Sequence, residues 1–249
     1  MKNKEHVMLS ILVVGTGRMG KELERVITED DNLNLVGLVG QSEKETLRAG
    51  VPAADVVIDF SHKDMLPLVK AYIDCTKAAL VSGTTGYTQE DTDLIQDLSK
   101  QVPVIQASNY SLGVAVLRKL SAQAAKYLKE WDIEIVETHH NQKVDAPSGT
   151  ALSLLESVQS PEKNEVLYGR SGMIGKRSSA EIGMHALRGG TVAGTHAVHF
   201  FGLQEEIELT HRATNRAIFA TGAVAAAKKL ALQPAGLYTF DSLMFDTCN

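Results

Sequence analysis

The sequence contains 249 residues, of which 44% are hydrophobic and 22% are charged, so it can bury one large core or two modest ones. Its net charge of −5, without basic blocks, excludes a broad nucleic-acid-binding surface. No apolar run reaches the length of a transmembrane helix, and residues 1–8 lack the pattern of a signal peptide. Cys75 and Cys248 match no metal or redox spacing, which predicts a reduced cytoplasmic protein; a disulfide between them remains an open alternative.

The first predicted strand, Leu9 to Val14, leads into a Gly-x-Gly-x-x-Gly turn and then into apolar residues at helical spacing. Strand, glycine turn and helix are together typical of a dinucleotide fingerprint and favour a nucleotide site over a plain turn. The first glycine permits a tight turn, the second lets the backbone approach a pyrophosphate, and the third lets helix and strand pack closely. The candidate cofactor-binding residues are Gly15, Thr16, Gly17, Arg18, Met19 and Gly20.

The second predicted strand, Leu33 to Val39, bears on the choice between NADH and NADPH. An NAD enzyme usually carries an acid at the end of this strand, where it binds the adenosine ribose hydroxyls. Here that position is Gly40, so a 2′-phosphate would meet no repulsion. Nearby polar and basic residues would favour the phosphate, so we predict that NADPH is used at least as well as NADH. These residues are Arg18, Gln41, Ser42 and Lys44.

Three further strands, Asp55–Phe60, Ala78–Ser82 and Pro103–Ala107, complete a predicted parallel sheet, and Met65–Cys75 is a predicted helix. The Gly-Thr-Thr-Gly turn after the fourth strand has small residues that would let a flat ring approach closely, although locally a plain turn before a helix opened by Thr88 is an equal alternative. Five strands, each with such a turn at its carboxyl end, predict a Rossmann domain. The candidates are Gly83, Thr84, Thr85, Ala107, Ser108, Asn109 and Tyr110.

The second half of the chain has a different character. A long helix is predicted over residues 112–130, followed by a strand over 131–136 and a polar loop over 159–180. Residues 181–188, 191–200 and 205–212 alternate like strands, with Gly189-Gly190 predicted as a tight hairpin turn between the first two. The histidines in these strands, His185, His196, His199 and His211, are predicted to be mostly packing or surface residues, and Arg188 is a weaker candidate for substrate charge.

The run from Glu137 to Ala151 carries the most chemistry. His139 and His140 are neighbours, so on extended backbone they point to opposite sides and are poorly placed to bind one metal. An imidazole suits proton transfer near neutral pH, Lys143 offers a charge for an anion, and the helix start at Gly149 and Thr150 offers backbone N–H groups to a carboxylate. We therefore predict a small anionic substrate, a proton donor and no metal. On composition alone, a simple helix cap with ordinary loop histidines is an equal alternative.

The pattern His-His-x-x-Lys-x-Asp-Ala-Pro-Ser-Gly-Thr-Ala, over residues 139–151, resembles the signature of the dihydrodipicolinate reductase (4-hydroxy-tetrahydrodipicolinate reductase) family of lysine and diaminopimelate biosynthesis. The segments 17–20, 83–86 and 107–113 resemble the same family, so the likeness spans nearly the whole chain. The chain departs from the family pattern at Gly40 and in the short connection before Asp55, where family members often carry a longer insertion.

The resemblance implies NAD(P)H-dependent reduction of 4-hydroxy-tetrahydrodipicolinate, a cyclic imine dicarboxylate, to tetrahydrodipicolinate. Hydride would add to C4, and His139 would supply the proton for C3, with Lys143 a second candidate donor. His140, Lys143, Gly149 and Thr150 would bind the substrate, the last two through their N–H groups. Asp145 is interpreted as an orienting or hinge residue.

The resemblance also implies an α/β fold with two domains. Residues 1–110 and 215–249 would form the Rossmann dinucleotide-binding domain, the last part returning to it through a helix over 215–230. Residues 111–214 would form an α+β substrate-binding and oligomerisation domain with a mixed, largely antiparallel sheet. Such an open sheet needs a partner, and the family implies a homotetramer whose site forms when the two domains close.

Two alternatives stay open at this point. One is another NAD(P)-dependent amino-acid dehydrogenase, acting for example on diaminopimelate, which would release ammonia. The other is a non-enzymatic NAD(P)-sensing protein, which would bind nucleotide without turnover. The complete His-His-x-x-Lys and Ser-Gly-Thr patterns argue against the sensor, and the ligand spacing argues against a metal hydrolase.

Overall fold

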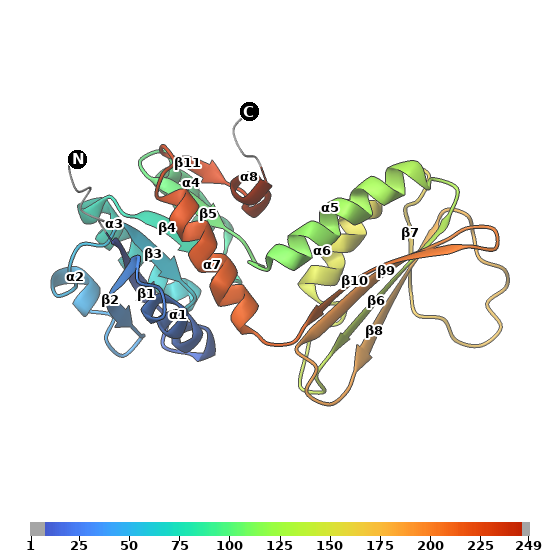
Figure 1. Ribbon diagram of the computed structural model, residues 1–249, viewed down its shortest axis with the longest axis horizontal. Helices are drawn as coiled ribbons and strands as arrows, with labels where there is room; N and C mark the ends of the chain where they lie inside the picture. The colour runs from blue at the N-terminus through green and yellow to red at the C-terminus, as the bar shows by residue number, and fades with distance from the viewer. Residues whose placement is uncertain (1–7, 246–249) are drawn as a thin grey trace. The chain divides into compact units, whose positions relative to one another are not determined.

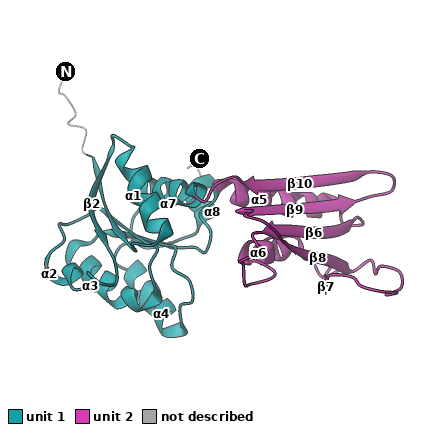
Figure 2. Ribbon diagram, turned by 90° about the horizontal axis from the view of Figure 1, so that it is seen from below, with its two compact units in different colours: residues 1–111, 217–249 teal, residues 112–216 magenta. Residues whose placement is uncertain are grey.

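The computed structural model describes residues 8–245, apart from the side chain of Ala49, so Cys248 lies outside the described part. The chain divides into two compact units (Figure 2). Unit 1 contains residues 1–111 and 217–249, and unit 2 contains residues 112–216. The chain therefore leaves unit 1 once, after its fifth strand, and returns to it at the helix that begins at Ala217.

Unit 1 is built on a six-stranded sheet in the order β11-β5-β4-β3-β1-β2, with every pair of neighbours parallel. Its strands are short apolar runs, and the residues of β1 from Ile11 to Val14 have no exposed surface. Such continuous burial is expected where helices cover both faces of a parallel sheet. The strands are β1 (Leu9–Val14), β2 (Leu33–Val39), β3 (Val56–Asp59), β4 (Ala79–Ser82), β5 (Pro103–Gln106) and β11 (Gly236–Tyr238).

Helices lie on both faces of this sheet (Figure 2). One face packs against α3 and α4, with Leu12, Val57 and Leu80 in its core cluster. The other packs against α1 and α7, and α7 allows close approach because its buried positions are mostly alanine. The helices are α1 (Arg18–Thr28), α2 (Thr46–Ala49), the 3-10 turn η1 (Lys63–Met65), α3 (Leu66–Thr76), α4 (Gln89–Ser99), α7 (Ala217–Leu230) and α8 (Phe240–Phe245).

Unit 2 is a five-stranded sheet in the order β10-β9-β6-β8-β7 (Figure 1). Its helices α5 and α6 pack against each other and cover one face, where Leu117, Ile133, Leu154 and Phe200 share one core cluster. Strand β6 alternates strictly between partly exposed and buried residues, as expected for a strand with one covered face. The elements are α5 (Leu112–Tyr127), β6 (Asp132–His139), α6 (Gly149–Val158), β7 (Glu165–Tyr168), β8 (Glu181–Arg188), β9 (Gly194–Phe201) and β10 (Glu206–Ala213).

The predicted hairpin at Gly189-Gly190 is wrong. Strands β8 and β9 do not pair, because β6 lies between them, parallel to β8 and antiparallel to β9. The segment that joins β8 to β9 therefore crosses the carboxyl end of β6. The sheet is mixed, but two of its four pairings are parallel, so the description as largely antiparallel also needs correction.

Two segments contain more structure than expected. The predicted loop over 159–180 includes β7, which extends the unit 2 sheet beside β8. The predicted tail forms β11, which pairs with β5, and then α8. The predicted class, a Rossmann domain with an α+β domain, is confirmed. Within the described residues, no helix is both long and apolar enough to span a membrane.

Candidate active site

The alternation of β6 determines which of its polar residues are buried. Ile133 and Ile135 face the helices, and the same side of the strand then continues with Glu137 and His139. Glu137 has no exposed surface and His139 is 9% exposed. A buried carboxylate beside a buried imidazole is costly unless both are paired, so their partners define the site.

Glu137 has three donors within reach. His139 donates through Nδ1, Arg188 donates from Nη2 at 2.7 Å, and the backbone N–H of Ser148 donates at 3.3 Å. Burial acts to raise the pKa of Glu137, but the bonds from Arg188 and His139 outweigh it and hold this pKa below its usual value. Glu137 is therefore ionised, and it connects the end of β6, the end of β8 and the start of α6.

His139 is oriented by this contact. Because Nδ1 faces the carboxylate, Nε2 is the ring atom left for chemistry. A side chain at Gly194 would place its Cβ 3.1 Å from Nε2 of His139, so the glycine keeps this atom uncrowded. Burial lowers the pKa of His139, and the Glu137 carboxylate opposes that effect without cancelling it.

His196, on the neighbouring strand β9, completes the cluster. Its ring lies edge-on to that of His139, with centroids 5.1 Å apart, and its Nε2 is 3.1 Å from Oγ of Ser148. Burial lowers the pKa of His196 to about 4, so this imidazole is neutral near pH 7. The three groups lie close enough to hold a metal ion, but the oxygens of Glu137 are already engaged by His139, Arg188 and Ser148, which favours a hydrogen-bonded network.

The turn after β6 is held by the segment that crosses the strand end. The backbone N–H of His140 donates to the carbonyl of Val192 at 2.8 Å, and that of Gly189 donates to His139 at 2.9 Å. The side chain of His140 points elsewhere, with Nε2 2.9 Å from Nη2 of Arg216. A guanidinium only donates, so Nε2 of His140 is the acceptor of this hydrogen bond.

Lys143 is a partly buried cation close to the same network. Its Nζ lies 2.7 Å from Oδ1 of Asp145, and the ion pair lowers the pKa of that carboxyl. The backbone carbonyl of Asp145 accepts from Arg188 at 2.7 Å. Asp145 thus orients Lys143 and ties it, through Arg188, to Glu137.

Helix α6 begins beside these residues. Ser148 is its N-cap, and its Oγ accepts from the backbone N–H of Ala151 at 3.2 Å. Backbone N–H groups in the first turn of a helix have no acceptor within the helix and attract anions. A Cβ built on Gly149 would meet no atom within 4 Å, so the space at this helix start is open. Thr150 follows in the same first turn.

In unit 1, the glycine turn after β1 fits a dinucleotide. Gly15 has φ +116°, and a Cβ there would lie 2.4 Å from the carbonyl oxygen of Phe60. A Cβ on Gly20 would lie 1.7 Å from the carbonyl oxygen of Gly15, so the helix packs directly on the turn. At Gly17 a Cβ would meet nothing within 4 Å, which leaves the backbone open to a ligand. Thr16 and Arg18 are exposed, and Met19 is half-buried.

The turn after β4 is joined to the end of β3, where Asp59 is fully buried. Burial raises the pKa of Asp59, although it accepts from the backbone N–H of Ser61 at 3.0 Å. The same N–H of Ser61 also lies 3.1 Å from Oγ1 of Thr84, so the ends of β3 and β4 are joined. Thr84 is buried and Thr85 exposed, and a Cβ on Gly83 would lie 2.3 Å from the ring of Phe60.

Two side chains of the segment after β5 are hydrogen-bonded within unit 1. Tyr110 is 1% exposed, and its hydroxyl donates to the carbonyl of Ser82 at 2.7 Å, so its side chain belongs to the interior. The side chain of Asn109 accepts from the backbone N–H of Ser111 at 2.8 Å. Of the predicted residues here, Ser108 is the exposed one, and Ala107 is half-buried.

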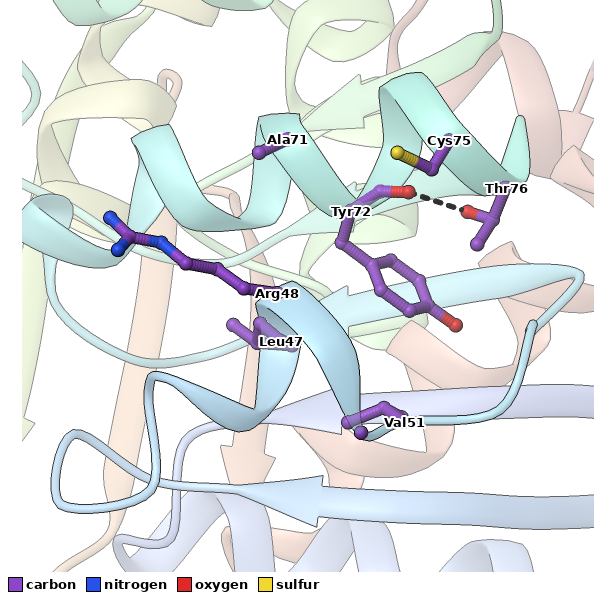
Figure 3. A pocket seen from close by; sticks show the side chains of 8 residues that line it. Leu47, Arg48, Val51, Ala71, Tyr72, Cys75 and Thr76 are labelled. Atoms are coloured by element: carbon purple, nitrogen blue, oxygen red, sulfur yellow. Dashed lines mark hydrogen bonds between the residues drawn. The ribbon is translucent and has the colours of Figure 1, made fainter.

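A hollow of ≈ 350 Å³ lies elsewhere in unit 1, between α2 and α3 (Figure 3). Its wall includes Leu47, Val51 and Tyr72 beside the exposed Cys75. The hydroxyl of Tyr72 is already used, because it donates to the carbonyl of Pro52 at 2.6 Å. None of the predicted motifs contributes to this hollow, so it is not the candidate site.

Sequence reasoning missed Glu137, His196 and Arg216 as members of the site. Glu137 could have been found from its position two residues before His139, since period-two alternation puts both on one face of a strand. His196 required the register that pairs it with Glu137, which a single sequence does not contain. Arg216 stands 76 positions from its partner His140, and no local pattern links them.

A parallel Rossmann unit joined to a mixed-sheet unit, with an oriented histidine beside a lysine, defines a two-domain nicotinamide-dependent oxidoreductase. The family models for "Dihydrodipicolinate reductase, N-terminus" and "Dihydrodipicolinate reductase, C-terminus" match residues 9–110 and 113–244. This chain belongs to the dihydrodipicolinate reductase family.

Named relatives agree with this assignment. The 4-hydroxy-tetrahydrodipicolinate reductase of Clostridium tetani is 39% identical, over 96% of this chain and 98% of that protein. The enzyme of the same name from Akkermansia muciniphila is 41% identical, over 95% and 98%. The solved structure of dipicolinate-bound dihydrodipicolinate reductase from Paenisporosarcina sp. TG-14 has the same fold, with a TM-score of 0.75 at 23% identity over 96% of this chain and 100% of that one.

Proposed function

We propose that this protein reduces 4-hydroxy-tetrahydrodipicolinate to tetrahydrodipicolinate with NADPH or NADH. The observation that carries the proposal is the network around Glu137. It contacts His139 and the start of α6 directly, and it reaches Lys143 through Arg188 and Asp145. The proposed proton donor, a cation and a helix start that could bind an anion would thus belong to one unit, which supports reduction of a cyclic imine dicarboxylate.

The substrate carries two carboxylates, and unit 2 offers groups for them. The N–H groups of Gly149 and Thr150 stand at the open start of α6 and would hold one carboxylate. Lys143, oriented by Asp145, would pair with negative charge on the substrate. His140 would bind beside them, with Arg216 fixing its ring.

His139 is the proposed proton donor. Loss of water from the substrate gives a conjugated imine, hydride adds at C4, and the resulting enamine takes a proton at C3. Glu137 holds Nδ1 of His139, so the proton would leave from Nε2. Burial lowers the pKa of His139 in the free protein, and a bound dicarboxylate would raise it again because negative charge favours the imidazolium. Lys143 is a second candidate donor.

Unit 1 would hold the cofactor at its three glycine-containing or polar turns. The open backbone at Gly17 would admit the pyrophosphate, and the turns after β4 and β5 would hold the nicotinamide end, mainly through backbone groups. The reduced nicotinamide supplies the hydride when bound. A reaction that draws on this nucleotide pool fits the cytoplasmic location we propose.

A homotetramer is the proposed assembly. Both helices of unit 2 pack on one face of its sheet, and the opposite face carries partly exposed residues such as Val136, His199 and Phe201. An open, partly apolar sheet face is stabilised when a second copy covers it. Sedimentation analysis of the purified protein would test this assembly.

The reaction is tested by following nicotinamide oxidation at 340 nm with substrate made in situ from pyruvate and aspartate semialdehyde by a synthase. We expect turnover that disappears when the synthase is left out. Ammonia release from diaminopimelate would instead support an amino-acid dehydrogenase. Nucleotide binding without turnover in either assay would support a sensor and contradict the proposal.

A further inference from the structure

A carboxylate lies beside the end of β2, although Gly40 itself has no side chain, because Glu43 folds back toward it. A Cβ built on Gly40 would lie 2.5 Å from Oγ1 of Thr16 and 2.8 Å from Oε2 of Glu43. Thr16 belongs to the glycine turn, which is joined to β2 because the N–H of Gly15 donates to the carbonyl of Val39 at 2.8 Å. Glu43 therefore brings its carboxylate into the space that an acid at position 40 would fill.

Glu43 is held there by a tight turn. Its backbone N–H donates to the carbonyl of Gly40 at 3.2 Å, and its Oε2 accepts from the N–H of Gly40 at 3.1 Å. The hydroxyl of Ser42, followed by the Gly40 N–H, keeps the pKa of Glu43 below its ordinary value. The carboxylate is thus ionised at neutral pH and oriented beside the glycine turn.

We propose that Glu43 is the ribose-binding carboxylate of this nucleotide site and gives the protein a preference for NADH over NADPH. In Rossmann domains an acid at the end of the second strand accepts hydrogen bonds from the adenosine ribose hydroxyls and repels a 2′-phosphate. The expectation that NADPH is used at least as well rested on the glycine at position 40. Glu43 supplies the missing carboxylate from three residues further along, so we now expect NADH to be preferred.

The variant Glu43→Gln tests the role of the charge. Arg18, at the start of α1, and Lys44, in the turn after β2, are both exposed, so a 2′-phosphate would find cations once the carboxylate is neutralised. We expect the preference for NADH, as a ratio of dissociation constants, to be at least about tenfold in the natural protein and to fall by about tenfold in the variant. Glu45→Gln is the matched control, since Glu45 is equally close in sequence but pairs with Arg48 at 3.0 Å. Its ratio should stay within about twofold of the natural one.

The measurement is equilibrium binding of NADH and NADPH, followed by nucleotide fluorescence. It needs no turnover, so it remains decisive if the proposed reductase activity fails while nucleotide binding persists. A natural protein that binds NADPH as tightly as NADH, or a Glu43→Gln variant with an unchanged ratio, would overturn the proposal. If Glu43→Gln binds neither nucleotide, competition binding to the natural protein tests the role of Glu43 instead. Adenosine 2′,5′-bisphosphate should displace NADH at least about tenfold less well than AMP, which differs from it only by the 2′-phosphate, and equal displacement would refute the role.

Discussion

The carboxylate of Glu137 accepts a hydrogen bond from Nδ1 of His139, two residues further along the buried side of β6. This contact fixes the tautomer of the imidazole and leaves Nε2, beside Gly194, as the atom proposed to deliver the proton. The hydrogen bonds from Arg188 and His139 hold the pKa of the Glu137 carboxyl below its usual value and keep it ionised. We therefore propose that Glu137 acts through His139 as a positioning residue.

Replacement of Glu137 by glutamine should lower kcat by about 10²-fold or more. An amide can present its NH₂ group to Nδ1 and so stabilise the wrong tautomer of His139. Because the carboxylate raises the pKa of His139, its loss should also move the descending limb of the kcat–pH profile to lower pH. Steady-state rates over pH would show both effects, with the exposed Glu130→Gln as control. An unmoved limb would show that Glu137 has only a structural role.

Lys143→Ala should damage substrate binding and turnover together. Loss of a hydrogen bond to a charged group costs about 1.5–3 kcal/mol, which corresponds to roughly 10–150-fold in substrate KM. The dissociation constant of pyridine-2,6-dicarboxylate, measured by calorimetry, should rise by a similar factor. Lys129→Ala, which removes an exposed lysine from the same unit, should change neither constant. Unaltered binding of the dicarboxylate would place the substrate elsewhere.

His196 should make unit 2 less stable in acid. Its folded pKa is about 4, below the value near 6.5 of an unfolded histidine, so the unfolded state binds a proton first as the pH falls. Stability is therefore full above about pH 6.5 and is lost between that pH and 4, by about 2 kcal/mol at pH 5. Urea unfolding at pH 7 and pH 5, followed by the fluorescence of Trp131, the single tryptophan, reports on unit 2.

The variant His196→Gln should flatten this pH dependence by about the same 2 kcal/mol. His139 and His211 also have lowered pKa values, so part of the acid sensitivity should remain. His62→Gln, at an exposed position in unit 1, serves as the control. If His196→Gln keeps the full difference between pH 7 and pH 5, the buried histidine is not its source.

The Rossmann unit was predictable because its signals are local. The apolar run of β1, the Gly-x-Gly-x-x-Gly turn and the cap of α4 at Thr88 each lie within a few residues. Two of the predicted uses of the glycines agree with the geometry, since Gly15 has the positive φ of a tight turn and Gly20 packs directly on Gly15. In such a unit, periodicity and turn chemistry are enough to order the elements.

Unit 2 was harder to predict because its strand pairing is not local. The short link at Gly189-Gly190 resembles a hairpin, yet burial of β6 in the middle of the sheet requires β8 and β9 to lie on either side of it. The partner of His139 was two residues away, but recognition of its role required knowledge of which face is covered. In unit 1, the role of Glu43 was equally hard to predict, because only the folded turn brings its carboxylate to Gly40.

The most direct test of the account is the rate of His139→Gln in the coupled assay, with Glu130→Gln, at an exposed position of the same unit, as the control. We predict a loss of about 10²–10⁴-fold in kcat with substrate KM within a few fold, because a positioned acid contributes that much to rate and little to binding. Near-normal kcat in His139→Gln would contradict the assignment and leave Lys143 or water as the proton donor.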